Sequence, residues 1–219
     1  MSSHGHVRSF HLHGEAGKLE ALLNVGREGA AYAALVTHPH PLFGGTMHNK
    51  VVFHAMKALH GFGFPVMRFN FRGVGTSAGE HDNGRGEIDD VRAALRWLRD
   101  EYHLPIIFAG FSFGAATGLR AACPDADVEA LISIGTPINA EGRLYTYDLL
   151  AACTKPKLFI SGDHDEFAVP ELLAKVVEQA AEPKRFVLVR DADHFFAGHL
   201  DEMRAEIESW VGQTVGLTR

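Results

Sequence analysis

The chain is poor in cysteine: only Cys123 and Cys153 carry a thiol among its 219 residues. So few thiols exclude the disulfide framework of a small secreted protein and favour thiols that stay reduced. The N-terminal residues also lack the charged and apolar regions of a secretory signal. From both absences we expect a cytoplasmic protein.

Long hydrophobic runs and an excess of positive charge are missing as well. The longest apolar stretches have the length of a β-strand, far below the ~20 residues that cross a bilayer, so we expect no membrane partner. The formal net charge is −6, which provides no basic stripe for nucleic acid. With 46% hydrophobic and 22% charged residues and no repeat or linker, residues 1–219 are expected to form a single domain.

What the chain does contain is a regular alternation of strand-like and helix-like segments. A hairpin followed by repeated β-α units predicts an α/β fold with a mostly parallel, twisted eight-stranded sheet and helices on both faces. Ligands bind such sheets at the carboxyl ends of the strands. The strands are expected at 7–13, 19–25, 31–37, 65–71, 105–109, 128–134, 157–161 and 185–189, and the later helices at 115–122, 144–152, 171–181 and 200–211.

One short motif points to chemistry. Gly110-Phe111-Ser112-Phe113-Gly114 lies between the strand at 105–109 and a helix of small residues at 115–122. A G-x-S-x-G motif between a strand and a helix is typical of a nucleophile elbow, which lifts a serine hydroxyl clear of the sheet. The motif therefore predicts Ser112 as a nucleophile.

A serine hydroxyl needs a base, and the base needs a carboxylate that fixes its tautomer. In this kind of fold the chain order is Ser, then Asp or Glu, then His, each just beyond a strand. The ends of the last two strands match that order and predict Asp165 as the acid and His194 as the base. Asp163 is the less favoured acid, because it lies so close to its strand that it is expected to hold the turn. His199 is the nearest competitor for the base.

The oxyanion of an acyl-transfer intermediate needs two N–H donors. The first is expected from the backbone of Phe113, directly after the nucleophile. The second is expected from the loop at 38–47, which follows the third strand. The prolines of that loop have no N–H, so His40 and Leu42 remain as alternatives.

Aromatic residues flank the predicted site and indicate an apolar pocket for an acyl group. The expected pocket residues are Phe43, Phe111 and Phe195.

Other reactive side chains have a structural interpretation. Asn70 and Arg72 follow a strand and are expected to hold the glycine-rich loop at 72–86, in preference to binding an acidic substrate group. Neither cysteine has the context of a nucleophile. No metal site is expected, and the N-terminal histidines are interpreted as solvated surface residues: His4, His6, His11 and His13.

Taken together, these motifs resemble the α/β-hydrolase superfamily over nearly the whole chain. The loops His38-Pro39-His40-Pro41 and Gly44-Gly45-Thr46-Met47, with Asn70 to Gly75 and Gly110 to Gly114, resemble its small esterase-like serine hydrolases. The resemblance implies a Ser112–His194–Asp165 triad and hydrolysis without a metal or organic cofactor. The chain departs from many lipases in having His38-Pro39 where they carry His-Gly.

The segment at 135–156 is too short for the cap domain that many members of this superfamily insert before the acid-bearing strand. We therefore expect an open site and, as substrate, a small carboxylic ester cleaved through an acyl-enzyme. Two alternatives remain: hydrolysis of a thioester or peptide bond by the same triad, and a non-catalytic binding protein on the same fold. The sequence makes no prediction of the oligomeric state.

Overall fold

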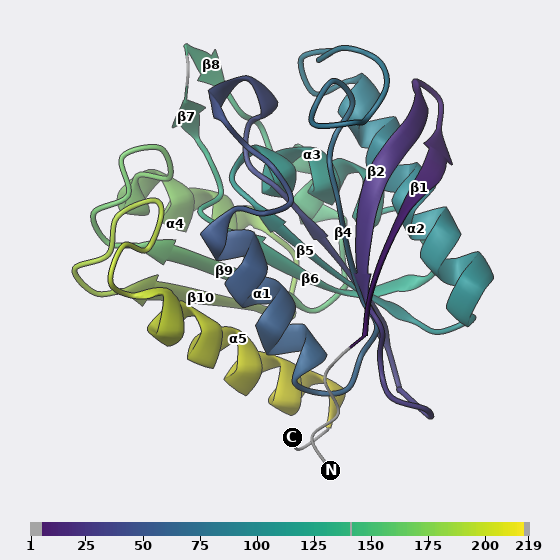
Figure 1. Cartoon of the computed structure of the whole chain (residues 1–219). Coiled ribbons are helices and arrows are strands. Elements are labelled where there is room, and N and C mark those ends of the chain that lie inside the picture. Colours follow the sequence, from purple (N-terminus) through teal and green to yellow (C-terminus); the bar gives the residue numbers. More distant parts are fainter. Residues whose placement is uncertain (1–5, 141, 217–219) are drawn as a thin grey trace.

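A computed structural model describes residues 6–140 and 142–216 of the chain. Within them, eight strands form one sheet in the order β1-β2-β4-β3-β5-β6-β9-β10, with helices on both faces (Figure 1). The predicted α/β fold with an eight-stranded sheet is confirmed. The strands of this sheet are β1 (Val7–Gly14), β2 (Gly17–Asn24), β3 (Ala33–Thr37), β4 (Val66–Phe69), β5 (Ile106–Phe111), β6 (Val128–Ile134), β9 (Lys157–Gly162) and β10 (Lys184–Val189).

Strand direction differs between one end of the sheet and the rest. β1 and β2 form an antiparallel hairpin and β2 pairs antiparallel with β4, whereas the other neighbouring strands pair in parallel. The carboxyl ends of the parallel strands therefore share one edge of the sheet. At this edge Thr37 lies opposite Gly110, and Val189 lies opposite Gly162. The loops that carry the predicted site residues follow these strand ends.

Two layers of helices bury the sheet. α1 (Lys50–His60) and α5 (Leu200–Val215) cover one face, and α2 (Gly86–Tyr102), α3 (Phe113–Ala122) and α4 (Pro170–Gln179) cover the other (Figure 1). Because the central strands are buried on both sides, they are continuously apolar instead of alternating. All six residues of β5, for example, are buried.

The segment between β6 and β9 is compact. It holds a small hairpin of β7 (Asn139–Ala140) and β8 (Arg143–Leu144), followed by the 3₁₀ helix η2 (Asp148–Ala151). The predicted helix at 144–152 is wrong in its first half. Hydrogen bonds to the backbone before the hairpin replace it: Tyr145 N–H donates to the Ile138 carbonyl over 2.9 Å.

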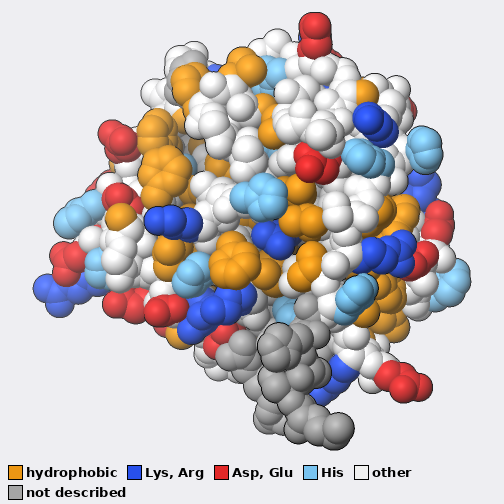
Figure 2. All heavy atoms as spheres, viewed as in Figure 1, with side chains coloured by type: hydrophobic (Ala, Val, Ile, Leu, Met, Phe, Trp, Pro, Cys, Tyr) orange, Lys and Arg blue, Asp and Glu red, His pale blue; other side chains and the backbone are white. Residues whose placement is uncertain are grey.

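The surface carries charges of both signs. On the face drawn in Figure 2, acidic and basic side chains are interspersed among hydrophobic ones. Across residues 6–140 and 142–216, every helix falls short of the length and apolar character that a bilayer-spanning helix requires. His4, one of the N-terminal histidines, lies outside the described residues.

Candidate active site

Ser112 lies in a sharp turn between β5 and α3, with φ 54° and ψ −122°. A positive φ is strained for a residue that carries a side chain. The flanking glycines permit this turn, since a Cβ on Gly110 would lie 2.7 Å from the Ala115 Cα. A Cβ on Gly114 would lie 2.4 Å from the His38 carbonyl oxygen. Strand, helix and the loop after β3 are thus in backbone contact around the serine.

The structure brings the predicted serine, histidine and aspartate together from three separate loops. The Nε2 atom of His194 lies 2.9 Å from the Ser112 hydroxyl oxygen. On the other side of the ring, Nδ1 lies 2.8 Å from one carboxylate oxygen of Asp165 and 2.9 Å from the other. An ionised Asp165 can only accept, so Nδ1 carries a proton and Nε2 accepts from the Ser112 hydroxyl.

Asp165 is only 2% exposed, and both oxygens of its carboxylate are hydrogen-bonded. The backbone N–H groups of Phe167 and Ala168 donate to one oxygen over 2.9 and 2.8 Å, and the Ser161 hydroxyl donates to the other over 2.9 Å. Burial raises the pKa of Asp165, but the hydrogen bonds from His194, Ala168 and Ser161 outweigh it and leave the pKa below its ordinary value. Asp165 therefore remains ionised at neutral pH.

The competing residues lie elsewhere. His199 is the N-cap residue of α5 and its Nδ1 atom lies 3.3 Å from a Glu202 carboxylate oxygen. Asp193 accepts hydrogen bonds from the N–H groups of Phe195 and Ala197, which shapes its own loop. Asp163 is directed to a different cluster, described below.

The loop after β3 is held by a buried histidine. The Nδ1 atom of His38 lies 2.7 Å from the Pro39 carbonyl oxygen, and Nε2 accepts from the Phe71 N–H over 3.0 Å. His38 is fully buried, and burial lowers its pKa to about 4. The neutral ring joins the ends of β3 and β4 and fixes the path of the loop that carries His40.

The two alternatives for the second oxyanion donor differ in this loop. The Leu42 N–H donates to the imidazole Nδ1 of His40 over 3.2 Å, which caps the 3₁₀ helix η1 (Pro41–Phe43). The Leu42 side chain is 68% exposed, and only His40 lines the pocket beside Ser112. The geometry therefore favours the backbone N–H of His40. Phe113 begins α3, where an N–H has no intrahelical acceptor.

A pocket of about 240 Å³ opens above the serine. Of the predicted pocket residues, Phe43 and Phe195 line it, together with Tyr145 and Phe167. The assignment of Phe111 to the pocket is corrected. Its side chain is fully buried and packs beneath the His194 ring, 5.0 Å between centroids, because that position of β5 faces the α1 and α5 layer.

Asn70 and Arg72 have the structural role that their positions indicated. The Arg72 guanidinium donates bidentate hydrogen bonds to the Asp90 carboxylate, with N···O distances of 2.8 to 3.2 Å. Asn70 accepts from the Met47 N–H and donates to Glu20. Both residues tie the loop after β4 to its surroundings.

The two cysteines lie at the far end of α3 from Ser112. Cys123 is the C-cap residue of that helix and shares a surface hollow with Cys153. A hydrogen bond from Cys123 is the largest cause that lowers the pKa of Cys153 to about 6. These thiols have no place in the chemistry at Ser112.

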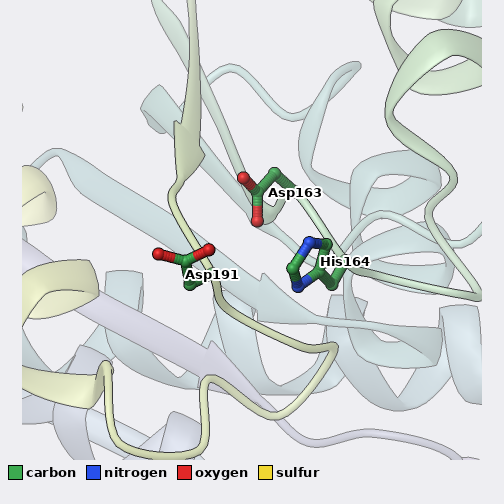
Figure 3. A group of neighbouring side chains, drawn as sticks. All are labelled: Asp163, His164 and Asp191. Atoms are coloured by element: carbon green, nitrogen blue, oxygen red, sulfur yellow. The ribbon is translucent and has the colours of Figure 1, made fainter.

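A group that could hold a divalent cation lies beside the site, although no metal was expected. The ligand atoms of Asp163, His164 and Asp191 all lie within 4.8 Å of one another. Figure 3 shows the three side chains facing a common space from the loops that follow β9 and β10. His164 and Asp191 are exposed, and exposed acidic groups are common without any bound ion. Asp163 takes no part in binding His194.

Comparison with known proteins agrees with this geometry. A family model described as an alpha/beta hydrolase domain matches residues 35–210. An alpha-beta serine hydrolase homologue from Coxiella burnetii has a TM-score of 0.84 and 38% identity, covering 95% of this chain and 97% of that chain. A serine hydrolase without a lid from Xanthomonas campestris has a TM-score of 0.84 and 34% identity, covering 100% and 99%. An uncharacterised protein of Rickettsia prowazekii is 34% identical over 208 residues, which cover 92% of this chain and 87% of that protein.

The chain belongs to the alpha/beta hydrolase family. The predicted resemblance to its cap-less serine hydrolases is confirmed. These relatives support a hydrolase, and the compact segment between β6 and β9 agrees with a protein that has no lid.

The sequence did not predict two residues of the candidate site, one that hydrogen-bonds to Asp165 and one that lines the pocket. Ser161, the fifth residue of β9, donates to Asp165, and its position four residues before the acid was the available signal. Tyr145 forms a pocket wall, but its place depends on the β7–β8 hairpin, for which the sequence carried no clear periodicity.

Proposed function

We propose that the protein is a serine esterase that cleaves small carboxylic esters through an acyl-enzyme. The observation that carries the proposal is the hydrogen-bonded series from the Ser112 hydroxyl through His194 to Asp165 at the floor of an open pocket. Such a series converts an alcohol into a nucleophile at neutral pH.

In the first half of the reaction, Ser112 Oγ attacks the ester carbonyl and its proton passes to His194 Nε2. Asp165 stabilises the imidazolium that forms, and it keeps the Nδ1–H tautomer in place. His194 then donates the proton to the leaving alcohol as the carbon–oxygen bond breaks. An acyl group remains on Ser112.

The negative charge of the tetrahedral intermediate is stabilised by two backbone donors, the N–H groups of Phe113 and His40. Phe113 contributes in addition the positive end of α3. The rigidity of the His40 loop follows from the buried His38. In the second half, His194 removes a proton from water, which attacks the acyl-enzyme. As the bond between the acyl carbon and Ser112 Oγ breaks, His194 returns the proton to Oγ and the acid is released.

The pocket favours a short acyl group. Its volume of about 240 Å³ lies below the roughly 300–1,000 Å³ that is usual for drug-sized ligands, and most of its wall is aromatic or aliphatic. Phe43 and Phe195 are 70% and 52% exposed, so the rim is open. A thioester or peptide substrate uses the same residues, and a panel of matched esters, thioesters and amides distinguishes the leaving groups.

The test is hydrolysis of p-nitrophenyl acetate and butyrate by the wild type and by Ser112→Ala. We expect loss of essentially all turnover in the variant, while Ser209→Ala, an exposed serine on α5, keeps full activity. Mass spectrometry after treatment with a fluorophosphonate probe should find the label on Ser112. An unlabelled Ser112 in folded protein without ester turnover would instead favour the non-catalytic binding protein.

A further inference from the structure

A second hollow, of about 290 Å³, lies beside the catalytic pocket, and Tyr145 borders both. Its walls come from the loop before α2, the outer side of α3 and the β8 strand. We call it the arginine groove, because its lining includes Arg85, Arg120 and Arg143.

Two of these guanidinium groups have no acidic partner among the described residues. Arg120 donates to the carbonyl and hydroxyl oxygens of Thr146 over 3.1 and 3.5 Å, and Arg143 donates to the Asn83 amide oxygen over 3.4 Å. Arg85 differs, since it pairs with Asp82 at 3.0 Å. In a chain of net charge −6, Arg120 and Arg143 make this groove locally positive.

The arginine groove begins where the catalytic pocket ends. A Cβ placed on Gly84 would lie 3.6 Å from Arg143 Nη1, 3.7 Å from Phe113 Cε2 and 3.8 Å from the Thr117 hydroxyl oxygen. The ring of Phe113, which lines the catalytic pocket, and the charge of Arg143 therefore lie around one point. The Arg143 charge also contributes, after burial and the charge of His81, to lowering the pKa of His40 to about 4.

The direction of α3 gives the groove its length. The helix starts at Phe113, next to the nucleophile, and Arg120 lies seven residues further on. At a rise of 1.5 Å per residue, this separation is about 10 Å along the helix axis. A substrate that reaches from Ser112 to Arg120 therefore extends a few methylene groups beyond the ester.

We propose that the arginine groove binds an anionic group, a carboxylate or a phosphate, carried by the ester substrate at the end remote from Ser112. The proposal rests on the proposed function, because it assigns a substrate class to the same site. Guanidinium groups bind such oxyanions through paired, charge-assisted hydrogen bonds. Arg143 and Arg120 supply these donors, and Tyr145 forms the wall over which the substrate passes.

The test compares hemiesters with their neutral counterparts. One series, the mono-p-nitrophenyl esters of succinate, glutarate, adipate and pimelate, places the carboxylate on the acyl side. A second series, the acetate esters of hydroxyphenyl-alkanoic acids and of hydroxyphenyl phosphate, places a carboxylate or a phosphate on the leaving group. Each compound is matched with its methyl ester, and the readout is the ratio of kcat/KM for the anionic over the neutral member.

We expect this ratio to fall about tenfold in Arg143→Gln and in Arg120→Gln, as for loss of one hydrogen bond to a charged group. The wild-type ratio should also decrease as KCl is added, because partly exposed charges are screened. Arg92→Gln, which removes the same charge from the exposed face of α2, should leave the ratio unchanged. If the ratios of both groove variants equal that of the wild type in both series, the groove does not bind the substrate.

An equilibrium measurement separates this inference from the proposed function. In Ser112→Ala protein, calorimetric titration with mono-p-nitrophenyl glutarate reports binding whether or not the wild type hydrolyses esters. An added Arg143→Gln should raise Kd about tenfold, whereas an added Arg92→Gln should not. Absence of ester turnover together with Arg143-dependent binding would refute the esterase proposal and retain the anion site. Ester turnover, with Kd and the kcat/KM ratios of anionic over neutral substrates both unchanged by Arg143→Gln, would retain the esterase proposal and refute the anion site.

Discussion

Two buried histidines lie at the same edge of the sheet, and their partners differ. His38 follows β3 and His194 follows β10, and they are 0% and 5% exposed. Both ring nitrogens of each are engaged at 2.7 to 3.0 Å. The ring nitrogens of His38 hydrogen-bond only to backbone atoms, the Pro39 carbonyl and the Phe71 N–H, whereas those of His194 hydrogen-bond to two side chains, the hydroxyl of Ser112 and the carboxylate of Asp165.

The difference decides what each ring can do with a proton. Protonation of His38 would convert its Nε2 from an acceptor into a donor facing the Phe71 N–H, so the native structure keeps the ring neutral. In the proposed mechanism, the Asp165 charge on one side matches protonation of His194, and the Ser112 hydroxyl on the other side supplies the proton. Burial alone therefore does not distinguish the two histidines; the chemistry of their hydrogen-bond partners does, and it supports the proposed role of His194.

The largest expected effect comes from removing the charge beside His194. Asp165→Asn keeps the size of the side chain but no longer stabilises the imidazolium, so kcat for p-nitrophenyl butyrate should fall about ten-thousandfold. Asp163→Asn is the matched control, because it neutralises a neighbouring carboxylate that faces a different cluster. Equal activity of both variants would remove Asp165 from the mechanism.

The second prediction concerns the stability that the neutral His38 contributes. In the unfolded chain this ring takes up a proton near its ordinary pKa of 6.5, but in the native state only near 4. Between these values the unfolded state binds more protons, so the free energy of unfolding falls as the pH is lowered, by about 3 kcal/mol over the full window.

Urea unfolding of the wild type and of His38→Gln at pH 7 and pH 4.5 measures this contribution. The variant should be less stable at pH 7, and it should lose less stability on acidification than the wild type. Identical pH dependence in the two proteins would mean that His38 does not carry the effect, because all other titrating groups are shared.

A smaller effect is expected at Ser161, which hydrogen-bonds to Asp165 rather than to Ser112 or His194. Ser161→Ala removes the hydroxyl that donates to Asp165, which should raise the pKa of that carboxyl and lower kcat/KM about fivefold, in line with the loss of one hydrogen bond. Since a positioning role acts through Asp165, the acidic limb of the pH profile should shift upward as well. Ser133→Ala, a buried serine that bonds to Thr136, should leave the profile in place.

The sequence carried the fold and the order of the site residues because both depend on local patterns. Apolar runs buried on two faces located the strands, and the motif around Ser112, with Asp165 and His194 beyond later strands, pointed to the candidate site. The residues that line the pocket were harder to predict from the sequence. Both Phe111 and Phe113 are buried, yet Phe111 packs against the α1 and α5 layer while Phe113 lines the pocket, because the chain turns between them.

Other features depend on contacts between distant segments. The role of His38 requires Phe71, which is 33 positions away, and the choice between His40 and Leu42 depends on a side-chain cap inside the loop. The β7–β8 hairpin is too short to leave a period in the sequence.

That hairpin separates the two hollows with only two residues in each of its strands. It is tied to the body of the protein on both sides, where Ile138 N–H donates to the Phe167 carbonyl and Arg120 donates to Thr146. Three of its four strand residues, Asn139, Arg143 and Leu144, are not buried, so they can be changed without disturbing the core. A library that randomises Asn139, Arg143 and Leu144 therefore changes the wall between the two hollows while Ser112, His194 and Asp165 keep their positions.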